Sequence, residues 1–196
     1  MPPKAILAAL RHVWLTLKPL DIPMAILGGI ALAAWKYVRA TKDVDLLLAA
    51  GPDDPQRLLE ALWAAGIRSK RPGPATRIGR LELLQFLYEP PETFLDIQVD
   101  LLLARSDYHH QALARRVPLE LPDLGVDLAV LACEDLILHK LLSERIIDQA
   151  DTVALLRLNR QSLDLAYLRH WAAGLQVGPG LAEAWRAAWP GEPLPL

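Results

Sequence analysis

The chain has 196 residues, of which 53% are hydrophobic and 22% charged, and 21 basic against 23 acidic side chains leave a formal net charge of -2. This length fits about one ordinary domain with a buried core. The composition excludes a disordered chain, which would be poor in apolar residues and highly charged. It also excludes a globally basic surface, so any contact with nucleic acid must be local. The single cysteine, Cys133, excludes an internal disulfide framework and a cysteine-rich zinc site.

The most apolar stretch, residues 22–35, is shorter than the ~20 residues that a bilayer requires, and it contains Pro23 and two glycines. The N-terminal segment lacks the longer apolar region and the small-residue cleavage site of a secretory leader. We therefore expect a cytoplasmic protein without a membrane partner, and the lone cysteine fits that reducing compartment.

The first part of the chain alternates short apolar runs with helical patterns, which is typical of mixed α and β folds. In chain order, we expect a helix at 4–17, a strand at 24–27, a helix at 30–37, a strand at 43–48 and a helix at 55–65. A loop rich in proline, glycine and arginine follows, up to about Arg80.

Two further apolar runs, at 81–88 and 94–103, predict strands, and the Pro-Pro turn between them predicts a hairpin. Beyond them the pattern is mainly helical. Helices are expected at 107–115, 134–145, 147–158, 164–174 and 180–188, with short extended pieces near 117–120 and 125–128. The prediction is an α/β (α+β) fold: a core at 1–130 with a mixed sheet and flanking helices, and a helical region at 131–196 packed on it.

Two aspartates two residues apart, Asp43 and Asp45, share one face of the strand predicted at 43–48. Adjacent carboxylates repel unless a positive charge lies between them, and oxygen ligands suit Mg²⁺ or Mn²⁺. Upstream, Gly28 and Gly29 join a strand to a helix. Such a helix start exposes backbone N–H groups to anions, and glycine lets a phosphate approach closely.

A third carboxylate from a neighbouring strand would complete a metal site. The run at 94–103 offers two, Asp96 and Asp100, on the face opposite its apolar residues. Spacing alone does not decide between them.

Three segments together resemble the DNA polymerase beta-type nucleotidyltransferase superfamily, which has a Gly-Gly or Gly-Ser at a helix start, then D-x-D, then a third acidic strand. They are GGIALAAWKYVRATKDVDLLL (28–48), VDLLLARSDY (99–108) and EDLILHKLLSERIIDQADTVALL (134–156). The first is most similar to small bacterial nucleotidyltransferases related to abortive-infection toxins. The resemblance spans roughly residues 22–157 and implies a nucleotidyltransferase-like fold.

The resemblance implies that Asp43 and Asp45 bind catalytic Mg²⁺ or Mn²⁺ ions. It favours Asp100 over Asp96 as the third carboxylate, which would also serve as general base. Gly28 and Gly29 would hold the phosphates of a nucleoside triphosphate.

Several basic residues have two interpretations. Arg39 and Lys42 flank the acidic pair and could meet the triphosphate or offset the local negative charge. Lys140 matches a position where the family can bring a lysine to the nucleotide, and a surface charge is the alternative. The basic loop Arg68–Arg80 could contact an RNA backbone, although a solvated loop is the more common case.

The leading hypothesis is an enzyme that transfers a nucleoside monophosphate from an NTP to an acceptor hydroxyl on tRNA, protein or a small molecule. The alternative is a non-catalytic or regulatory toxin–antitoxin component with the same fold, with an antitoxin as its partner. Three carboxylates and two glycines are present together, which argues against a degenerate copy. A D-x-D phosphatase or glycosyltransferase would explain the aspartates but not the upstream glycines.

Overall fold

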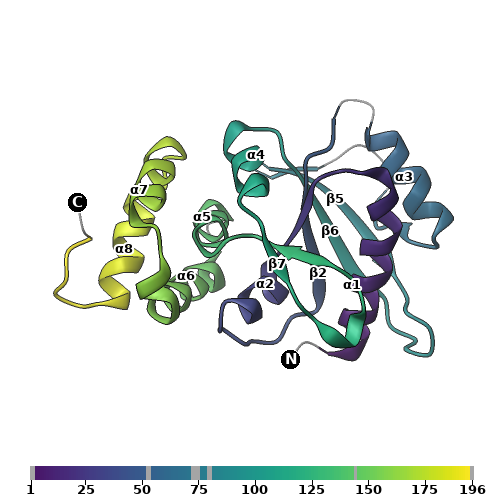
Figure 1. The fold of residues 1–196 in the computed structure, drawn as a ribbon, viewed down its shortest axis with the longest axis horizontal. Coiled ribbons are helices and arrows are strands. Elements are labelled where there is room, and N and C mark those ends of the chain that lie inside the picture. The colour runs from purple at the N-terminus through teal and green to yellow at the C-terminus, as the bar shows by residue number, and fades with distance from the viewer. Residues whose placement is uncertain (1–2, 52–53, 72–75, 79–80, 144, 195–196) are drawn as a thin grey trace. The chain divides into compact units, whose positions relative to one another are not determined.

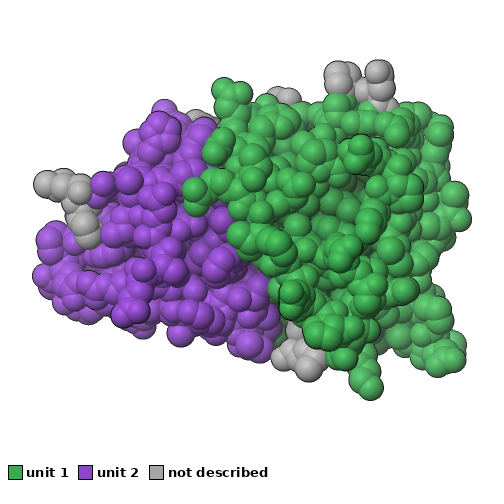
Figure 2. Space-filling view, in the orientation of Figure 1, with its two compact units in different colours: residues 1–30, 40–131 green, residues 31–39, 132–196 purple. Residues whose placement is uncertain are grey.

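The computed structural model describes residues 3–51, 54–71, 76–78, 81–143 and 145–194 (Figure 1). These residues form two compact units (Figure 2). The first comprises residues 1–30 and 40–131, and the second residues 31–39 and 132–196. In the described ranges, every helix is too short or too polar to cross a membrane.

The first unit is built on one mixed sheet, which has eight strands within the described residues. In order across the sheet they are β3 (Arg68–Ser69), β5 (Leu81–Tyr88), β6 (Ile97–Leu103), β2 (Asp43–Leu48), β1 (Met24–Leu27), β8 (Leu128–Val130) and β7 (Val117–Leu119), and β4 (Thr76–Ile78) pairs with β5. The central pair, β2 and β6, is parallel, whereas β5 and β6 form the predicted antiparallel hairpin.

The register of the central strands follows from the alternation of buried and half-buried side chains along them. In β6, four apolar residues are buried and alternate with half-buried Gln98, Asp100 and Leu102. Because a shift by one residue would turn every buried side chain to the other face, this alternation holds β6 in place beside β2. Helix α1 (Lys4–Leu17) lies against these two strands, and α3 (Asp54–Ala64) lies against α1 (Figure 1).

The remaining elements of the first unit are short: η1 (Lys18–Leu20), α4 (Asp107–Ala114) and η2 (Pro122–Leu124). Ser106 caps α4 by accepting a hydrogen bond from the backbone N–H of His109. Helix α2 (Gly28–Ala34) begins in the first unit and ends in the second.

The second unit is helical, and its elements are α5 (Cys133–Ser143), α6 (Ile146–Asn159), η3 (Arg160–Ser162), α7 (Leu165–Gly174) and α8 (Gly178–Ala188). Helix α5 packs against α6 and α7, and α8 packs against α6 and α7. Residues 31–39 belong to this unit although they precede most of the sheet, a grouping that chain order does not reveal.

The sequence predictions give the order of the main elements correctly, and four details differ. Helix α2 begins at Gly28 rather than residue 30 and ends at Ala34. Strand β6 begins at Ile97 rather than 94, after a segment in which Phe94 has a positive φ of 51°. The expected loop before Arg80 contains β3 and β4. The second extended piece lies at 128–130 because η2 and the left-handed Gly125 occupy the preceding residues.

Candidate functional site

The three aspartates that the sequence singles out lie together in the structure. Asp43, Asp45 and Asp100 are each half-buried, and each offers one carboxylate oxygen such that the three oxygens lie within 4.8 Å of one another. Asp45 and Asp100 are directly opposite in the parallel pair of β2 and β6, and Asp43 is opposite Gln98. The sheet therefore gathers three carboxylates from two strands on one face.

Local sequence explains this placement. Val44 and Leu46 alternate with the aspartates of β2 and are fully buried, as are Val99 and Leu101 beside Asp100. Burial of these apolar side chains on one face forces the carboxylates onto the other.

Amide side chains surround Asp100. Gln98 donates to both carboxylate oxygens at 2.9 and 3.0 Å, and Gln85, opposite Asp100 in the hairpin, donates at 3.2 Å. Burial raises the pKa of Asp100 above the ordinary value, and the charge of Asp43 adds to this, while the amide hydrogen bonds and Lys70 oppose it. Neither glutamine was identified from the sequence. The i, i+2 spacing of Gln98 and Asp100 could have identified Gln98, because it places the two side chains on one face of the strand.

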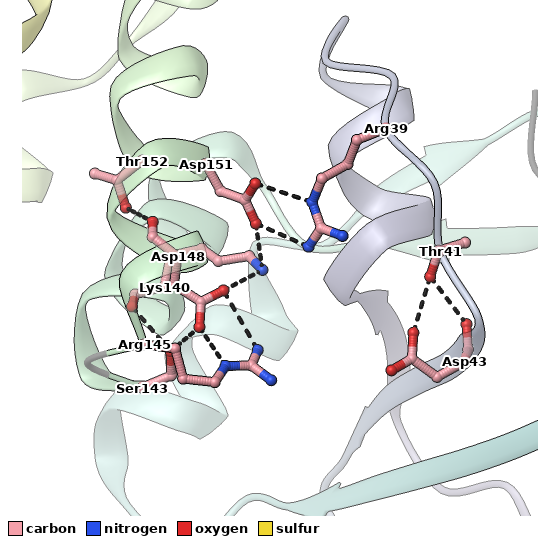
Figure 3. Close-up of polar contacts among 9 residues, drawn as sticks. All are labelled: Arg39, Thr41, Asp43, Lys140, Ser143, Arg145, Asp148, Asp151 and Thr152. Atoms are coloured by element: carbon pink, nitrogen blue, oxygen red, sulfur yellow. Dashed lines mark hydrogen bonds and ion pairs between the residues drawn. The ribbon is translucent and has the colours of Figure 1, made fainter.

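Asp43 contacts Thr41, and Asp45 lies against the first glycine of the Gly-Gly pair. Thr41 donates its hydroxyl hydrogen to Oδ1 of Asp43 at 2.8 Å (Figure 3). Gly28, with a positive φ of 66°, lies so near Asp45 that an added β-carbon would come within 1.8 Å of Oδ2. Sequence analysis did not identify Thr41.

The donor set fits a divalent cation. Three converging carboxylates repel one another, and the charge of Asp43 adds to the larger effect of burial in raising the pKa of Asp100. Hard oxygen ligands are those that Mg²⁺ and Mn²⁺ prefer. Asp43, Asp45 and Asp100 could therefore hold such an ion. In the described residues, this is the one group of three or more metal-ligating side chains with suitable spacing.

Asp96, the competing third carboxylate, lies elsewhere. It precedes the first residue of β6, is exposed, and forms an ion pair of 2.5 Å with Arg68. It is not a member of the cluster that contains Asp100.

Two predicted nucleotide-binding residues take part in ion pairs of the second unit (Figure 3). Arg39 donates through Nε and Nη2 to the two carboxylate oxygens of Asp151, each at 2.9 Å. Lys140 is only 6% exposed and lies 2.6 Å from Asp148 and 2.8 Å from Asp151. Neither Asp148 nor Asp151 was identified from the sequence. Their spacing of three residues in a helix could have indicated a shared binding face, because residues three apart lie on one side of the helix.

The other predicted binding residues are more open. Lys42, next to Asp43, is exposed. In the basic loop, Arg68, Lys70 and Arg71 are exposed, and Lys70 donates to Oε1 of Gln98. The side chains of Arg77 and Arg80 lie outside the described residues.

Similarity to known proteins comes from structure alone: no protein-family model and no curated protein sequence matches the chain. A crystal structure of an antigenic nucleotidyltransferase-like protein from Paracoccidioides brasiliensis matches with a TM-score of 0.55 at 20% identity, over 93% of each chain. A putative nucleotidyltransferase from H. pylori matches with a TM-score of 0.53 at 16% identity, over 94% of this chain and 81% of its own.

The crystal structure of ANT(2″)-Ia in complex with adenylyl-2″-tobramycin matches with a TM-score of 0.53 at 17% identity, over 87% of this chain and 96% of that one. At such low identity these matches show the fold. The chain has a nucleotidyltransferase-like fold, as the sequence predicts, with a candidate carboxylate triad in its sheet.

Proposed function

We propose that the protein is a metal-dependent nucleotidyltransferase, which moves a nucleoside monophosphate from an NTP to an acceptor hydroxyl. The observation that carries the proposal is the convergence of Asp43, Asp45 and Asp100 within 4.8 Å on a nucleotidyltransferase fold. Three carboxylates this close repel one another in the absence of a cation. Their convergence therefore fits a site that binds a divalent cation together with an anionic substrate.

In the proposed reaction, Asp43 and Asp45 would hold Mg²⁺ or Mn²⁺ and Asp100 would complete the ligand set. When bound, such ions orient the reactants and neutralise the charge that develops on the phosphates. The acceptor oxygen forms a bond to the α-phosphorus while the bond to the leaving pyrophosphate breaks. Asp100 would accept the proton of the hydroxyl, because its carboxylate lies in the same cluster as the two aspartates of β2.

Five residues remain proposed nucleotide contacts. Gly28 and Gly29 form the first turn of α2, and Lys42 is an exposed cation beside Asp43. These three would face the phosphates. Arg39 is proposed because it flanks the acidic pair in sequence, and Lys140 because of the family resemblance. Each would have to serve the nucleotide in addition to the buried aspartates that it contacts.

For the acceptor, we propose RNA with a free terminal hydroxyl. Lys70 follows the edge strand β3, its backbone N–H bonds Gln85, and its ammonium group reaches Gln98, which contacts Asp100. Arg71 next to it is exposed, and Phe94 is 88% exposed near the start of β6. Exposed cations and an aromatic ring are the groups that bind single-stranded nucleic acid.

The test is incubation with each NTP, labelled at the α-phosphate, with Mg²⁺ and three kinds of acceptor: RNA, protein and small hydroxyl compounds. We expect label on RNA with a free 3′ end, none on RNA with a blocked end, and none with Asp43→Asn. Transfer to another acceptor would contradict the RNA proposal alone. An absence of transfer to every acceptor would contradict the enzymatic proposal.

A matched pair of variants tests the path of the acceptor. Lys70→Gln should raise the KM for RNA and leave the KM for NTP unchanged, because it removes a cation beside the acceptor path. Lys18→Gln removes an exposed cation from η1 and should change neither value. Equal effects of the two variants would point to general charge rather than to β3.

The resemblance of the sequence to abortive-infection enzymes also implies an antitoxin partner, and the lone cysteine supports the proposal of a cytoplasmic location. Growth of cells that express the wild-type chain or Asp43→Asn tests the toxin role, since only an active toxin would arrest growth. Normal growth with an active enzyme would contradict it.

A further inference from the structure

The two adjacent glycines at the start of α2 each lie against a different part of the carboxylate cluster. A β-carbon added at Gly28 would lie 1.8 Å from Oδ2 of Asp45, and one added at Gly29 would lie 2.5 Å from both Cβ and Oγ1 of Thr41. Non-bonded atoms do not approach so closely. The space that a side chain would need is occupied by Asp45 at the first glycine and by Thr41 at the second.

Thr41 in turn holds the first aspartate of the pair. Thr41 is 6% exposed, and its hydroxyl oxygen lies 2.8 Å from Oδ1 and 3.3 Å from the backbone carbonyl oxygen of Asp43. A buried hydroxyl that donates to one carboxylate oxygen restricts rotation of the carboxylate and leaves the other oxygen for another ligand. The absence of a side chain at Gly29 is what admits Thr41 to this place.

We propose that Gly28, Gly29 and Thr41 are positioning residues for the metal-binding carboxylates. Gly28 makes room for Asp45 directly, whereas Gly29 makes room for Thr41, which orients Asp43. This role is separate from a contact between the glycines and phosphate. The inference rests on the proposed function, because it concerns how the proposed metal ligands are held.

The backbone conformation of the turn explains a glycine at position 28 but not at position 29. Gly28 has a positive φ of 66°, a backbone conformation that favours glycine whatever surrounds it. Gly29 has no positive φ, so its backbone conformation does not require glycine, and the requirement comes from Thr41. Thr41 and Gly29 are therefore the informative positions.

The first experiment compares Thr41→Val and Thr41→Ser by titration with Mn²⁺, followed by electron paramagnetic resonance, without nucleotide. Valine keeps the shape and removes the hydroxyl, so we expect Mn²⁺ affinity to fall by about 10-fold, the lower end of the range for loss of a hydrogen-bond partner of a metal ligand. Serine keeps the hydroxyl and should restore affinity to within about threefold of wild type. The Mg²⁺ concentration for half-maximal transfer should shift in the same order.

The control is Thr152→Val, because Thr152 is also buried and donates its hydroxyl hydrogen to a carbonyl oxygen in α6. It loses the same atoms in the second unit and should leave Mn²⁺ affinity unchanged. A loss of affinity in Thr152→Val equal to that in Thr41→Val would overturn the inference, because the effect would then be one of stability.

The second experiment tests the contact between Gly29 and Thr41 by substitution of the glycine. Gly29→Ala should displace Thr41 and lower Mn²⁺ affinity, whereas Gly174→Ala, whose added methyl group would meet nothing within 4 Å, should not. Because Gly29→Ala and Thr41→Val disturb one contact, the double variant should lose less affinity than the product of the two single losses. Multiplicative losses would overturn the proposed coupling.

The results of these experiments distinguish a failure of the positioning role from a failure of the proposed enzymatic function. If wild type binds Mn²⁺ and transfers nucleotide but Thr41→Val and Gly29→Ala bind Mn²⁺ as wild type does, the positioning role is wrong and the enzyme proposal stands. If Asp45→Asn binds Mn²⁺ as tightly as wild type, the triad is not the metal site and both proposals fail.

Discussion

Among the described residues, a group of closely spaced aspartates occurs in each unit, and the two groups have different hydrogen-bond and ion-pair partners. In the second unit, Asp148 and Asp151 are at most 1% exposed at the side chain and form ion pairs with Lys140, Arg39 and Arg145. Burial alone would raise the pKa of Asp148, but hydrogen bonds from Arg145, Lys140 and Ser143 outweigh it and hold that pKa below the ordinary value.

In the first unit, three carboxylates converge while half-buried, and those of Asp43 and Asp100 accept hydrogen bonds from the uncharged side chains of Thr41, Gln85 and Gln98. The pKa of Asp100 is raised rather than lowered, mainly by burial. Buried carboxylates paired with cations of the chain are already compensated, whereas Asp43 and Asp100, which accept hydrogen bonds from neutral donors beside a third carboxylate, are suited to a cation from solution. The contrast therefore separates a structural cluster from a candidate metal site.

The largest expected effect tests that separation directly. Asp45→Asn should reduce transfer by more than about 10³-fold, because it removes a ligand of the charge-stabilising ion. It should also remove the rise in melting temperature that Mn²⁺ gives wild type. Without metal the variant should melt at or above the wild-type temperature, since one of three like charges is gone. Differential scanning calorimetry with Mn²⁺ and with EDTA measures both.

The matched control for that experiment is Asp148→Asn in the other cluster. It should lower the melting temperature with and without Mn²⁺ and leave the metal-induced rise intact. A metal-induced rise that disappears in Asp148→Asn and persists in Asp45→Asn would reverse the roles assigned to the two clusters.

The next effect concerns the members of the first cluster. Asp100→Ala should lose the chemical step by about 10²-fold or more, because no carboxylate accepts the proton of the hydroxyl, and should retain NTP binding through Asp43 and Asp45. Asp96→Ala should stay within a few-fold of wild type, since Asp96 pairs with Arg68 outside the cluster. Single-turnover assays decide this. An inactive Asp96→Ala with an active Asp100→Ala would contradict the register of β6.

Sequence periodicity sufficed for the central strands and for the shared face of Asp43 and Asp45, because burial of Val44 and Leu46 alternates with the aspartates of β2. It did not separate Asp96 from Asp100. Asp96 lies before the strand, after residues with positive φ values whose conformation no periodicity encodes.

The ion pair between Arg39 and Asp151 in the second cluster could not be predicted from the sequence, for a different reason. Arg39 and Asp151 are 112 positions apart, and their ion pair depends on residues 31–39 joining the C-terminal helices. Nothing local to either residue indicates that partner. Lys140 was accordingly interpreted as a nucleotide ligand or a surface charge, although it is buried between two aspartates.

A third prediction concerns the stability of that second cluster. Lys140→Met should lower the free energy of unfolding by about 3 kcal/mol, because removing one partner leaves buried carboxylates less compensated. Arg145→Ala should cost less than about 1 kcal/mol, since the Arg145 side chain is 68% exposed. Urea unfolding without nucleotide measures both. A Lys140→Met variant within about 1 kcal/mol of wild type would show that the two buried aspartates do not depend on this lysine.

The smallest effect is a difference in pH dependence between the clusters, measured in EDTA. Because burial raises the pKa of Asp100 in the folded state, its ionised form costs stability, and that cost disappears as pH falls through the raised value toward the unfolded value of about 3.9. Asp100→Asn carries no such charge. Its stability relative to wild type should therefore be highest at pH 7 and fall, by no more than about 1 kcal/mol at this half-exposed site, as pH is lowered to 4.

Asp148 should show the opposite sign. Its pKa is lowered on folding, so the stability it contributes is present above the unfolded value and is lost only as pH falls below about 3.9. The destabilisation of Asp148→Asn relative to wild type should hence be constant from pH 7 to 5 and shrink in stronger acid. Urea unfolding at pH 7, 5, 4 and 3 distinguishes the two. If both differences kept the same sign of slope, the two clusters would not be neutralised in different ways, and the argument for a metal at Asp43, Asp45 and Asp100 would lose its electrostatic support.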